Sequence, residues 1–225
     1  MAKIKNLSKK LELNNFCLSK SQLNPDLEIK AIIFDAGGAY LEGNFTDFVN
    51  KSYKLLGIDK TFFIKEEIVF DEEFNLGKIS AEECFRKFFG VPINDKQMEE
   101  IIKLWTTTWK LNPEMEEFVK KLGENYILAI LSNSDPVNHQ EYSRKGWFLP
   151  FKHLILSHEI GILKPDKRIY EITLEKLGIP GESCLFIDDQ EKNLVPAREF
   201  GMKTIVYKNF IQMKEELEKI GVKIK

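Results

Sequence analysis

The stretch from residue 31 to residue 44, "AIIFDAGGAYLEGN", decides the fold. Its apolar start, Ala31 to Phe34, predicts a short buried strand that ends at Asp35. Gly37 and Gly38 follow almost at once, and glycine allows a backbone to approach another group closely. A carboxylate at the end of a buried strand, with glycines just after it, marks a candidate site.

Further short apolar segments predict a sheet built around this first strand. The five predicted strands are 30–35 ("KAIIFD"), 126–133 ("YILAILSN"), 153–157 ("HLILS"), 183–189 ("SCLFIDD") and 203–208 ("KTIVYK"). Helical patterns separate them, one beginning at Asn112-Pro113 and another ending at Gly178. Strands that alternate with helices predict an α/β fold, with a Rossmann-like parallel sheet and helices on both faces.

Residues 45–110 interrupt the alternation, because they contain helix signals and no convincing strand. Ser80 and Glu83 form a capping-box pattern, and 94–110 carries an apolar stripe. We expect an all-helical insert at 45–110, a core formed by 30–44 and 111–225, and an N-terminal extension at 1–29 with one short helix and a linker. Most aromatic side chains of the insert are expected in its own core: Phe62, Phe63, Phe70, Phe74, Phe85, Phe88, Phe89, Trp105 and Trp109.

Composition excludes several classes of function. The chain has 225 residues, 43% of them hydrophobic and 30% charged, and a formal net charge of -2, which is ordinary for a globular protein. Neither nucleic acid nor a membrane is expected as a partner. No apolar run reaches membrane-spanning length, and the N-terminus lacks the apolar stretch of a signal peptide. The widely spaced Cys17, Cys84 and Cys184 suit a reducing compartment, so we expect a cytoplasmic protein.

Polar groups follow four of the predicted strands. Ligands of a parallel sheet bind beyond the carboxyl ends of its strands, so these groups are expected to converge. They are Asp35 after the first strand, Ser132 and Asn133 after the second, Lys164 at the start of the helix after the third, and Asp188 and Asp189 after the fourth.

This set of groups suits phosphoryl transfer. Asp35 and Asp188 would repel each other without a cation, and oxygen ligands with no His or Cys nearby suit Mg²⁺. One oxygen of Asp35 can hold the metal while the other attacks phosphorus and forms an aspartyl-phosphate. Lys164 supplies a fixed positive charge, and Ser132 and backbone N–H groups near the glycines can donate to phosphate oxygens.

Four motifs resemble those of the haloacid dehalogenase-like hydrolases: "IIFDAGG", "LAILSN", "GILKPD" and "CLFIDDQEKN". Their order over 30–209, with a helical insert after the first, resembles the subgroup with a small helical cap. The resemblance implies a Rossmann-like core, Mg²⁺ as cofactor and hydrolysis of a small phosphorylated metabolite. It also implies a role for each matching position. Asp35 is the nucleophile, Ser132 and Lys164 hold the phosphate, Asp35, the Gly37 carbonyl and Asp188 bind the metal with Asp189 supporting it through water, and Asn193 is structural. Asn133 and the Gly38 backbone are further candidates to hold the phosphate.

The sequence departs from the family pattern at Gly37. Most phosphatases of the family carry a second Asp there as general acid and base, a group whose loss costs about 10²–10⁴-fold in rate. Some members that resemble sugar 1-phosphate phosphatases share the "FD-x-G" pattern. Glu42, Asp47 or a metal-bound water are candidates to replace the acid, and so are His139 and His158, although packing roles suit both histidines better.

Two other functions stay open. One is a binding or scaffold protein on a catalytically weakened core, which Gly37 favours. The other is a metal-free dehalogenase-like hydrolase, which also uses a strand-end Asp but has no need of the Asp188–Asp189 pair. The sequence does not indicate the substrate or the oligomeric state.

Overall fold

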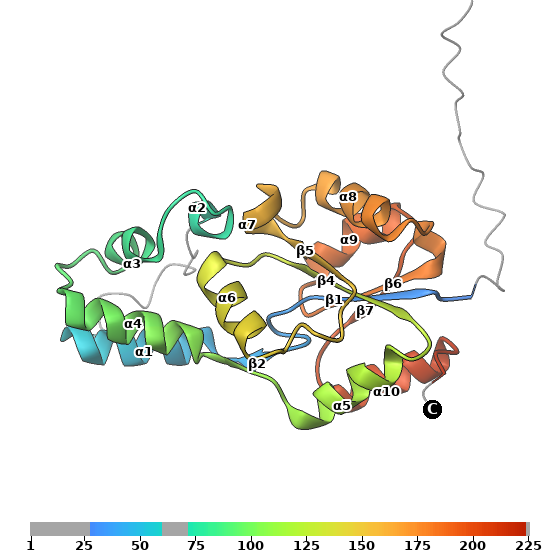
Figure 1. Cartoon of the computed structure of the whole chain (residues 1–225), viewed down its shortest axis with the longest axis horizontal. Helices are drawn as coiled ribbons and strands as arrows, with labels where there is room; N and C mark the ends of the chain where they lie inside the picture. The colour runs from blue at the N-terminus through green and yellow to red at the C-terminus, as the bar shows by residue number, and fades with distance from the viewer. Residues whose placement is uncertain (1–27, 60–71, 224–225) are drawn as a thin grey trace, which may run out of the picture.

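The computed structural model describes residues 28–59 and 72–223. Five parallel strands form one sheet in the order β5-β4-β1-β6-β7 (Figure 1). The strands are β1 (Ala31–Phe34), β4 (Ile127–Ser132), β5 (His153–Leu156), β6 (Cys184–Asp188) and β7 (Lys203–Val206). Every predicted strand forms, and the parallel α/β sheet is confirmed.

Helices cover both faces of the sheet. In the central strand β1, Ile32 and Phe34 face one core and Ala31 and Ile33 the other, because successive side chains of a strand point to opposite faces. Helices α5 (Pro113–Leu122) and α10 (Phe210–Lys219) pack on the first face, and α8 (Lys167–Leu177) and α9 (Glu191–Glu199) on the second (Figure 1). All four side chains of β1 are fully buried, so both faces of this strand pack against the core.

Local capping sets the ends of the core helices. Helix α5 begins after Asn112, whose side chain accepts from the N–H of Glu114, and α8 ends at Gly178 with a left-handed φ of 64°. One prediction is wrong here. Helix α8 begins at Lys167, after Asp166 caps it, so Lys164 lies in the preceding loop and not at the helix start.

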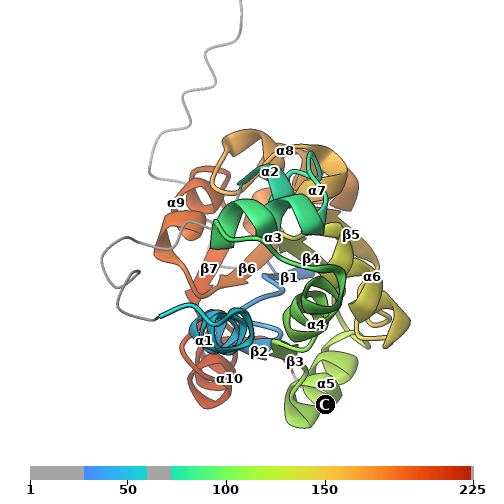
Figure 2. The same cartoon turned by 90° about the vertical axis from the view of Figure 1, so that its left-hand side faces the viewer.

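Helices of the insert form a separate body at one end of the sheet, at the left of Figure 1 and facing the viewer in Figure 2. They are α1 (Phe45–Leu56), α2 (Glu72–Asn75), α3 (Ala81–Phe89) and α4 (Asp95–Thr106). Phe74, Phe85, Phe89 and Trp105 are buried together there, as expected. Ser80 caps α3 by accepting from the N–H of Glu83. Phe62, Phe63 and Phe70 lie outside the described residues.

A two-stranded antiparallel sheet joins the insert to the core. It pairs β2 (Glu42–Gly43) with β3 (Trp109–Lys110). The prediction that 45–110 contains no strand is therefore wrong at its last two residues, because a two-residue strand has no sequence period to detect. Trp109 packs against the main core and not inside the insert. The division into extension, core and insert stays a prediction.

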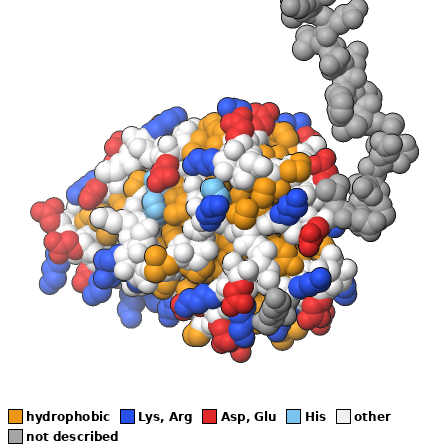
Figure 3. Space-filling model, turned by 45° about the vertical axis from the view of Figure 1, so that its right-hand side comes forward, with side chains coloured by type: hydrophobic (Ala, Val, Ile, Leu, Met, Phe, Trp, Pro, Cys, Tyr) orange, Lys and Arg blue, Asp and Glu red, His pale blue; other side chains and the backbone are white. Residues whose placement is uncertain are grey.

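Two remaining expectations concern the environment of the protein. No helix within 28–59 or 72–223 is long and apolar enough to cross a membrane. Acidic and basic side chains are interspersed over the face in Figure 3. Cys84 is buried in the insert and Cys184 in the main core. Cys17 and nearly all of the predicted N-terminal extension lie outside the described residues.

Candidate active site

Asp35 lies where β1 ends, at the carboxyl edge of the sheet. Its N–H continues the ladder by donating to the Ile187 carbonyl at 2.8 Å, which fixes the backbone under the side chain. The carboxylate is buried. Burial raises the pKa of Asp35 to about 7, the charge of Asp188 adds to the rise, and Lys164 opposes it. A charged Asp35 is therefore costly here unless a further cation joins the site.

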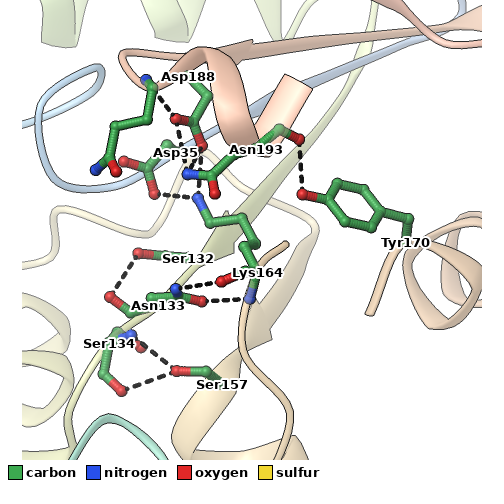
Figure 4. A network of polar contacts seen from close by, with 10 residues as sticks. Asp35, Ser132, Asn133, Ser134, Ser157, Lys164, Tyr170, Asp188 and Asn193 are labelled. Carbon is green, nitrogen blue, oxygen red and sulfur yellow. Dashed lines mark hydrogen bonds and ion pairs between the residues drawn. The ribbon is translucent and has the colours of Figure 1, made fainter. Parts of the chain in front are cut away.

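Lys164 connects two of the predicted carboxylates. Its Nζ donates to Asp35 Oδ1 and to Asp188 Oδ2, each at 2.7 Å (Figure 4). The Lys164 side chain is only 2% exposed. Burial alone would lower the pKa of this ammonium, but the two carboxylates outweigh it and hold the pKa above its usual value. The lysine is thus a fixed positive charge at the sheet edge.

Asn133 holds the loop that carries Lys164. Its Oδ1 accepts from the Lys164 N–H at 2.7 Å, and its Nδ2 donates to the Lys164 carbonyl at 3.0 Å (Figure 4). The sequence predicted only that Asn133 contacts phosphate, and that contact stays a prediction. The two hydrogen bonds from Asn133 to the Lys164 backbone were missed. Ser132, at the end of β4, is buried beside it, with Oγ 3.4 Å from the Asn133 carbonyl oxygen.

Helix α9 orients the third element of the site, Asp188. Oδ1 of Asp188 accepts from the Gln190 N–H at 2.8 Å and from Asn193 Nδ2 at 3.0 Å. The Asn193 carbonyl in turn accepts from the Tyr170 hydroxyl at 2.6 Å (Figure 4). Asn193 thus holds a site carboxylate in place. Tyr170 was not predicted, because a tyrosine in an apolar helical stripe looks like any core residue.

Gly38 and Asp189 are in direct contact. The backbone of Gly38 has a φ of 93°, and a Cβ there would lie 2.5 Å from Asp189 Oδ2. Both facts require glycine at this position. The Gly38 N–H already donates to the Leu41 carbonyl at 2.9 Å, so the turn occupies this donor. Its predicted contact with phosphate stays a prediction.

The carboxylates form a plausible set of ligands for a divalent cation. Asp35, Asp188 and Asp189 each offer an oxygen within 4.8 Å of the others. Partial burial raises the pKa of Asp189, with a further contribution from the charge of Asp188. Three carboxylates and one ammonium give a net charge of -2 when all are ionised, which a divalent cation would balance. Hard oxygen ligands fit Mg²⁺, so the residues match the predicted group.

Gly37 carries no side chain, and an indole covers the space beside it. A Cβ at Gly37 would lie 3.5 Å from ring carbons of Trp109. The carboxylates suggested as replacements have other partners: Glu42 accepts from Asn112 Nδ2 at 3.0 Å, and Asp47 pairs with Lys51 at 2.6 Å. A role for either carboxylate as the missing acid stays a prediction.

The helical insert contacts the core just beyond the second strand end. Trp105 Nε1 of α4 donates to Asp135 Oδ2 at 3.1 Å, and Ser157 Oγ donates to the Asn75 carbonyl at 2.6 Å. Asp135 is buried and precedes Pro136, the first residue of α6 (Pro136–Arg144). Sequence reasoning missed Asp135, although an Asp before a Pro at a helix start is a recognisable capping signal.

Comparison with known proteins finds relatives that are phosphatases. Two phosphatases are similar in sequence: D-ribitol-5-phosphate phosphatase of Bacteroides thetaiotaomicron is 27% identical over 200 residues, which are 84% of this chain and 97% of that protein. A sesquiterpene phosphatase of Aspergillus oryzae is 29% identical over 178 residues, 77% of this chain and 87% of that protein.

Solved structures share the fold. One is a haloacid dehalogenase-like (HAD) family enzyme of Bacteroides thetaiotaomicron, a variant in complex with magnesium and inorganic phosphate. It superimposes with a TM-score of 0.71 at 22% identity, covering 83% of this chain and 98% of that one. A putative HAD-hydrolase of Bacillus subtilis bound to magnesium gives a TM-score of 0.60 at 15% identity, covering 87% of this chain and 100% of that one. The predicted fold is confirmed.

A family model places these findings in one class. The model for haloacid dehalogenase-like hydrolases matches residues 29–201, which contain all four strand ends described above. The match confirms the prediction of a hydrolase, which was based on the four sequence motifs. Because it spans most of the chain and the whole site around Asp35 and Lys164, the chain belongs to the haloacid dehalogenase-like hydrolases.

Proposed function

We propose that the protein is a Mg²⁺-dependent phosphatase that hydrolyses a small phosphorylated metabolite through an aspartyl-phosphate on Asp35. One observation carries the proposal: the buried Lys164 ammonium binds Asp35 and Asp188 at the carboxyl edge of the sheet, beside a third carboxylate. Similar proteins named as phosphatases of ribitol 5-phosphate and of sesquiterpenes support a phosphate ester as substrate. The magnesium and phosphate bound by a protein of the same fold support the cofactor.

The nucleophile is held ready by its neighbours. Lys164 binds one oxygen of Asp35, so the carboxylate cannot rotate freely. A free oxygen of Asp35 forms a bond to phosphorus while the bond from phosphorus to the alcohol oxygen breaks. The charge of Lys164 stabilises the negative phosphoryl group, and Ser132 Oγ donates to one of its oxygens. Water then attacks phosphorus, releasing inorganic phosphate and restoring the Asp35 carboxylate.

The site contains residues that can bind the cofactor. Asp35, Asp188 and the Gly37 carbonyl would hold Mg²⁺, with Asp189 supporting it through water. When bound, the ion supplies Lewis-acid charge stabilisation to the transferring phosphoryl group. Its positive charge also favours the ionised form of Asp35, whose pKa burial raises to about 7.

The test is a screen of phosphate esters with Mg²⁺ and with excess chelator, on the natural protein and on Asp35→Asn. We expect turnover with Mg²⁺, none in chelator, and none in Asp35→Asn, which keeps the shape of the side chain without its nucleophilic charge. Hydrolysis that persists in chelator, or release of halide from 2-haloacids, would favour dehalogenase-like chemistry. Tight binding of Mg²⁺ and phosphate without turnover would favour a binding protein.

A further inference from the structure

A second cluster of metal-ligating side chains lies outside the Asp35 site. It consists of His139 on α6, and His158 and Glu159 on the short helix α7 (Ser157–Ile160). His139 Nδ1 is 3.2 Å from His158 Nε2 and 3.7 Å from Glu159 Oε1. The three ligand atoms all lie within 4.8 Å of one another, and the two rings are half-buried. The proposed phosphatase chemistry uses none of them.

These separations match those of ligands around one small cation. Zinc binds imidazole nitrogen at about 2.0–2.1 Å, and a tetrahedral angle then places two ligand atoms about 3.3 Å apart. The nitrogen–nitrogen distance of 3.2 Å is close to that value, and the nitrogen–oxygen distance of 3.7 Å is slightly longer. Glu159 is exposed, so its carboxylate has room to move toward the two rings. Little rearrangement of the backbone is required.

The tautomer of His158 also favours ligation. Its Nδ1 lies 3.0 Å from the Ser134 carbonyl oxygen and 3.1 Å from Ser134 Oγ. A hydrogen on Nδ1 lets both oxygens accept, whereas a carbonyl could never donate to the ring. The lone pair is then on Nε2, which faces His139. A carbonyl that fixes the ring in this way is the usual outer partner of a metal-ligating histidine.

The charges of the cluster suit a divalent cation. Burial lowers the pKa of His158, although the hydrogen bond to the Ser134 carbonyl and the charge of Glu159 oppose the fall. Glu159 contributes one negative charge. Two imidazoles and one carboxylate suit a borderline metal such as Zn²⁺, whereas Mg²⁺ prefers oxygen ligands alone.

We propose that His139, His158 and Glu159 form a second metal site, selective for Zn²⁺ or a similar transition-metal ion and separate from the carboxylate site at Asp35. A tetrahedral zinc ion has four coordination positions, so three protein ligands leave one position for water. Both rings are partly exposed, which gives water access to it. Histidine side chains are visible on the molecular surface in Figure 3. Without a metal, the same geometry is a hydrogen bond between the two rings.

An ion bound by this cluster would also affect the junction between the insert and the core. It would tie α6 to α7, and both helices contact the helical insert. Ser157, next to His158, donates to the Asn75 carbonyl of the insert, and a Cβ at Gly77 would lie 2.8 Å from the His158 carbonyl oxygen. A bound ion is therefore expected to stabilise the junction between insert and core.

The experiment measures Zn²⁺ binding to the full chain by calorimetry, after chelator treatment and in saturating Mg²⁺, which occupies the Asp35 site. We expect one Zn²⁺ per chain. His139→Gln and Glu159→Gln should each weaken Zn²⁺ affinity at least about tenfold, because loss of an outer partner alone already costs about 10- to 100-fold. Both residues are at least partly exposed, so both variants should fold.

The third histidine of the chain is the matched control. His153 begins β5 and is no part of the cluster, so His153→Gln should bind Zn²⁺ as the natural protein does. Co²⁺ should give a tetrahedral visible spectrum that His139→Gln abolishes. Zn²⁺ binding that survives in His139→Gln, or that is absent from the natural protein in Mg²⁺, would show that the two rings share only a hydrogen bond. Asp35→Asn should still bind Zn²⁺, so the result does not depend on the phosphatase proposal.

Discussion

At the scale of single residues, the proposed phosphatase lacks the acid that most family members carry at position 37. No side chain at position 37 can donate a proton, so negative charge builds on the leaving oxygen in the transition state. We expect rates to rise steeply with leaving-group acidity, with aryl phosphates and sugar 1-phosphates faster than esters of primary alcohols. A series of esters of graded acidity measures the slope. A shallow slope in the natural protein would reveal an unrecognised acid.

The indole of Trp109 limits what substitution at Gly37 can restore. A Cβ meets ring carbons of Trp109 at an ordinary 3.5 Å, so Gly37→Ala should fold normally. The carboxyl of Gly37→Asp, however, must extend past the ring. We expect Gly37→Asp alone to change the slope little and Gly37→Asp with Trp109→Leu to flatten it, because leucine lacks the distal ring carbons. Equal slopes in the single and double variants would show that Trp109 is no obstacle.

Asn133 offers a test of how tightly Lys164 must be positioned. Asn133→Ala removes both hydrogen bonds to the Lys164 backbone and leaves the Lys164–Asp35 pair intact. Misplacement of a catalytic group by about 1 Å can cost about 10²-fold, so we expect kcat to fall by up to that factor with a smaller change in KM. Asn193→Ala is the parallel variant on the Asp188 side. An unchanged kcat in Asn133→Ala would mean that the loop needs no clamp.

At the scale of elements, the contact between α4 and α6 depends on a buried acid. Burial raises the pKa of Asp135 to about 6, although Asn138, Trp105 and Val137 all donate to its carboxyl and oppose the rise. The unfolded value is about 3.9. Between these values the native state binds the proton more tightly, so the stability that Asp135 contributes is complete below pH 4 and falls as the pH rises to 6.

The matched variant for this prediction is Asp135→Asn, which does not titrate. The free energy of unfolding of the natural protein, minus that of Asp135→Asn, should fall by about 2 kcal/mol between pH 4 and pH 7, since one pKa unit is worth about 1.36 kcal/mol and the unfolded carboxyl is already partly ionised at pH 4. Denaturant unfolding across this range measures the difference, and the other groups cancel. A difference that is constant with pH would contradict the raised pKa.

The elements also show what the sequence could and could not predict. The central strands β1 and β6 were the easiest to detect because they are buried on both faces and are therefore almost uniformly apolar, as in "AIIF" and "CLFID". The pair β2 and β3 has two residues per strand and no such run. Lys164 was recognised, but the clamp by Asn133 was not, because it depends on two loops meeting across 31 residues of sequence. The same holds for Trp105 and Asp135, which the fold alone brings together.

At the scale of the whole molecule, Lys30 makes the first backbone hydrogen bonds to the sheet among the residues that the structure describes. The Lys30 N–H donates to the Ser183 carbonyl at 2.8 Å, and its carbonyl accepts from the Ile127 N–H at 2.9 Å. Every site residue follows, and the family match begins at residue 29. A chain truncated to begin near Leu27 should therefore fold and keep its rate per site, because every predicted site residue lies after that point. A folded but inactive truncated chain would assign a catalytic role to the extension.

Two polar contacts between insert and core, Trp105–Asp135 and Asn75–Ser157, have an evolutionary consequence. Their core partners, Asp135 and Ser157, lie in one continuous segment, whereas Asp35, Lys164 and Asp188 lie elsewhere in the chain. A lineage could therefore exchange the insert for a differently shaped one and adapt only that segment. The hydrolytic machinery would be inherited unchanged while the range of accepted molecules diversified. Paralogues descended from such an ancestor should differ most in the insert and in the α6 and α7 surfaces that receive it.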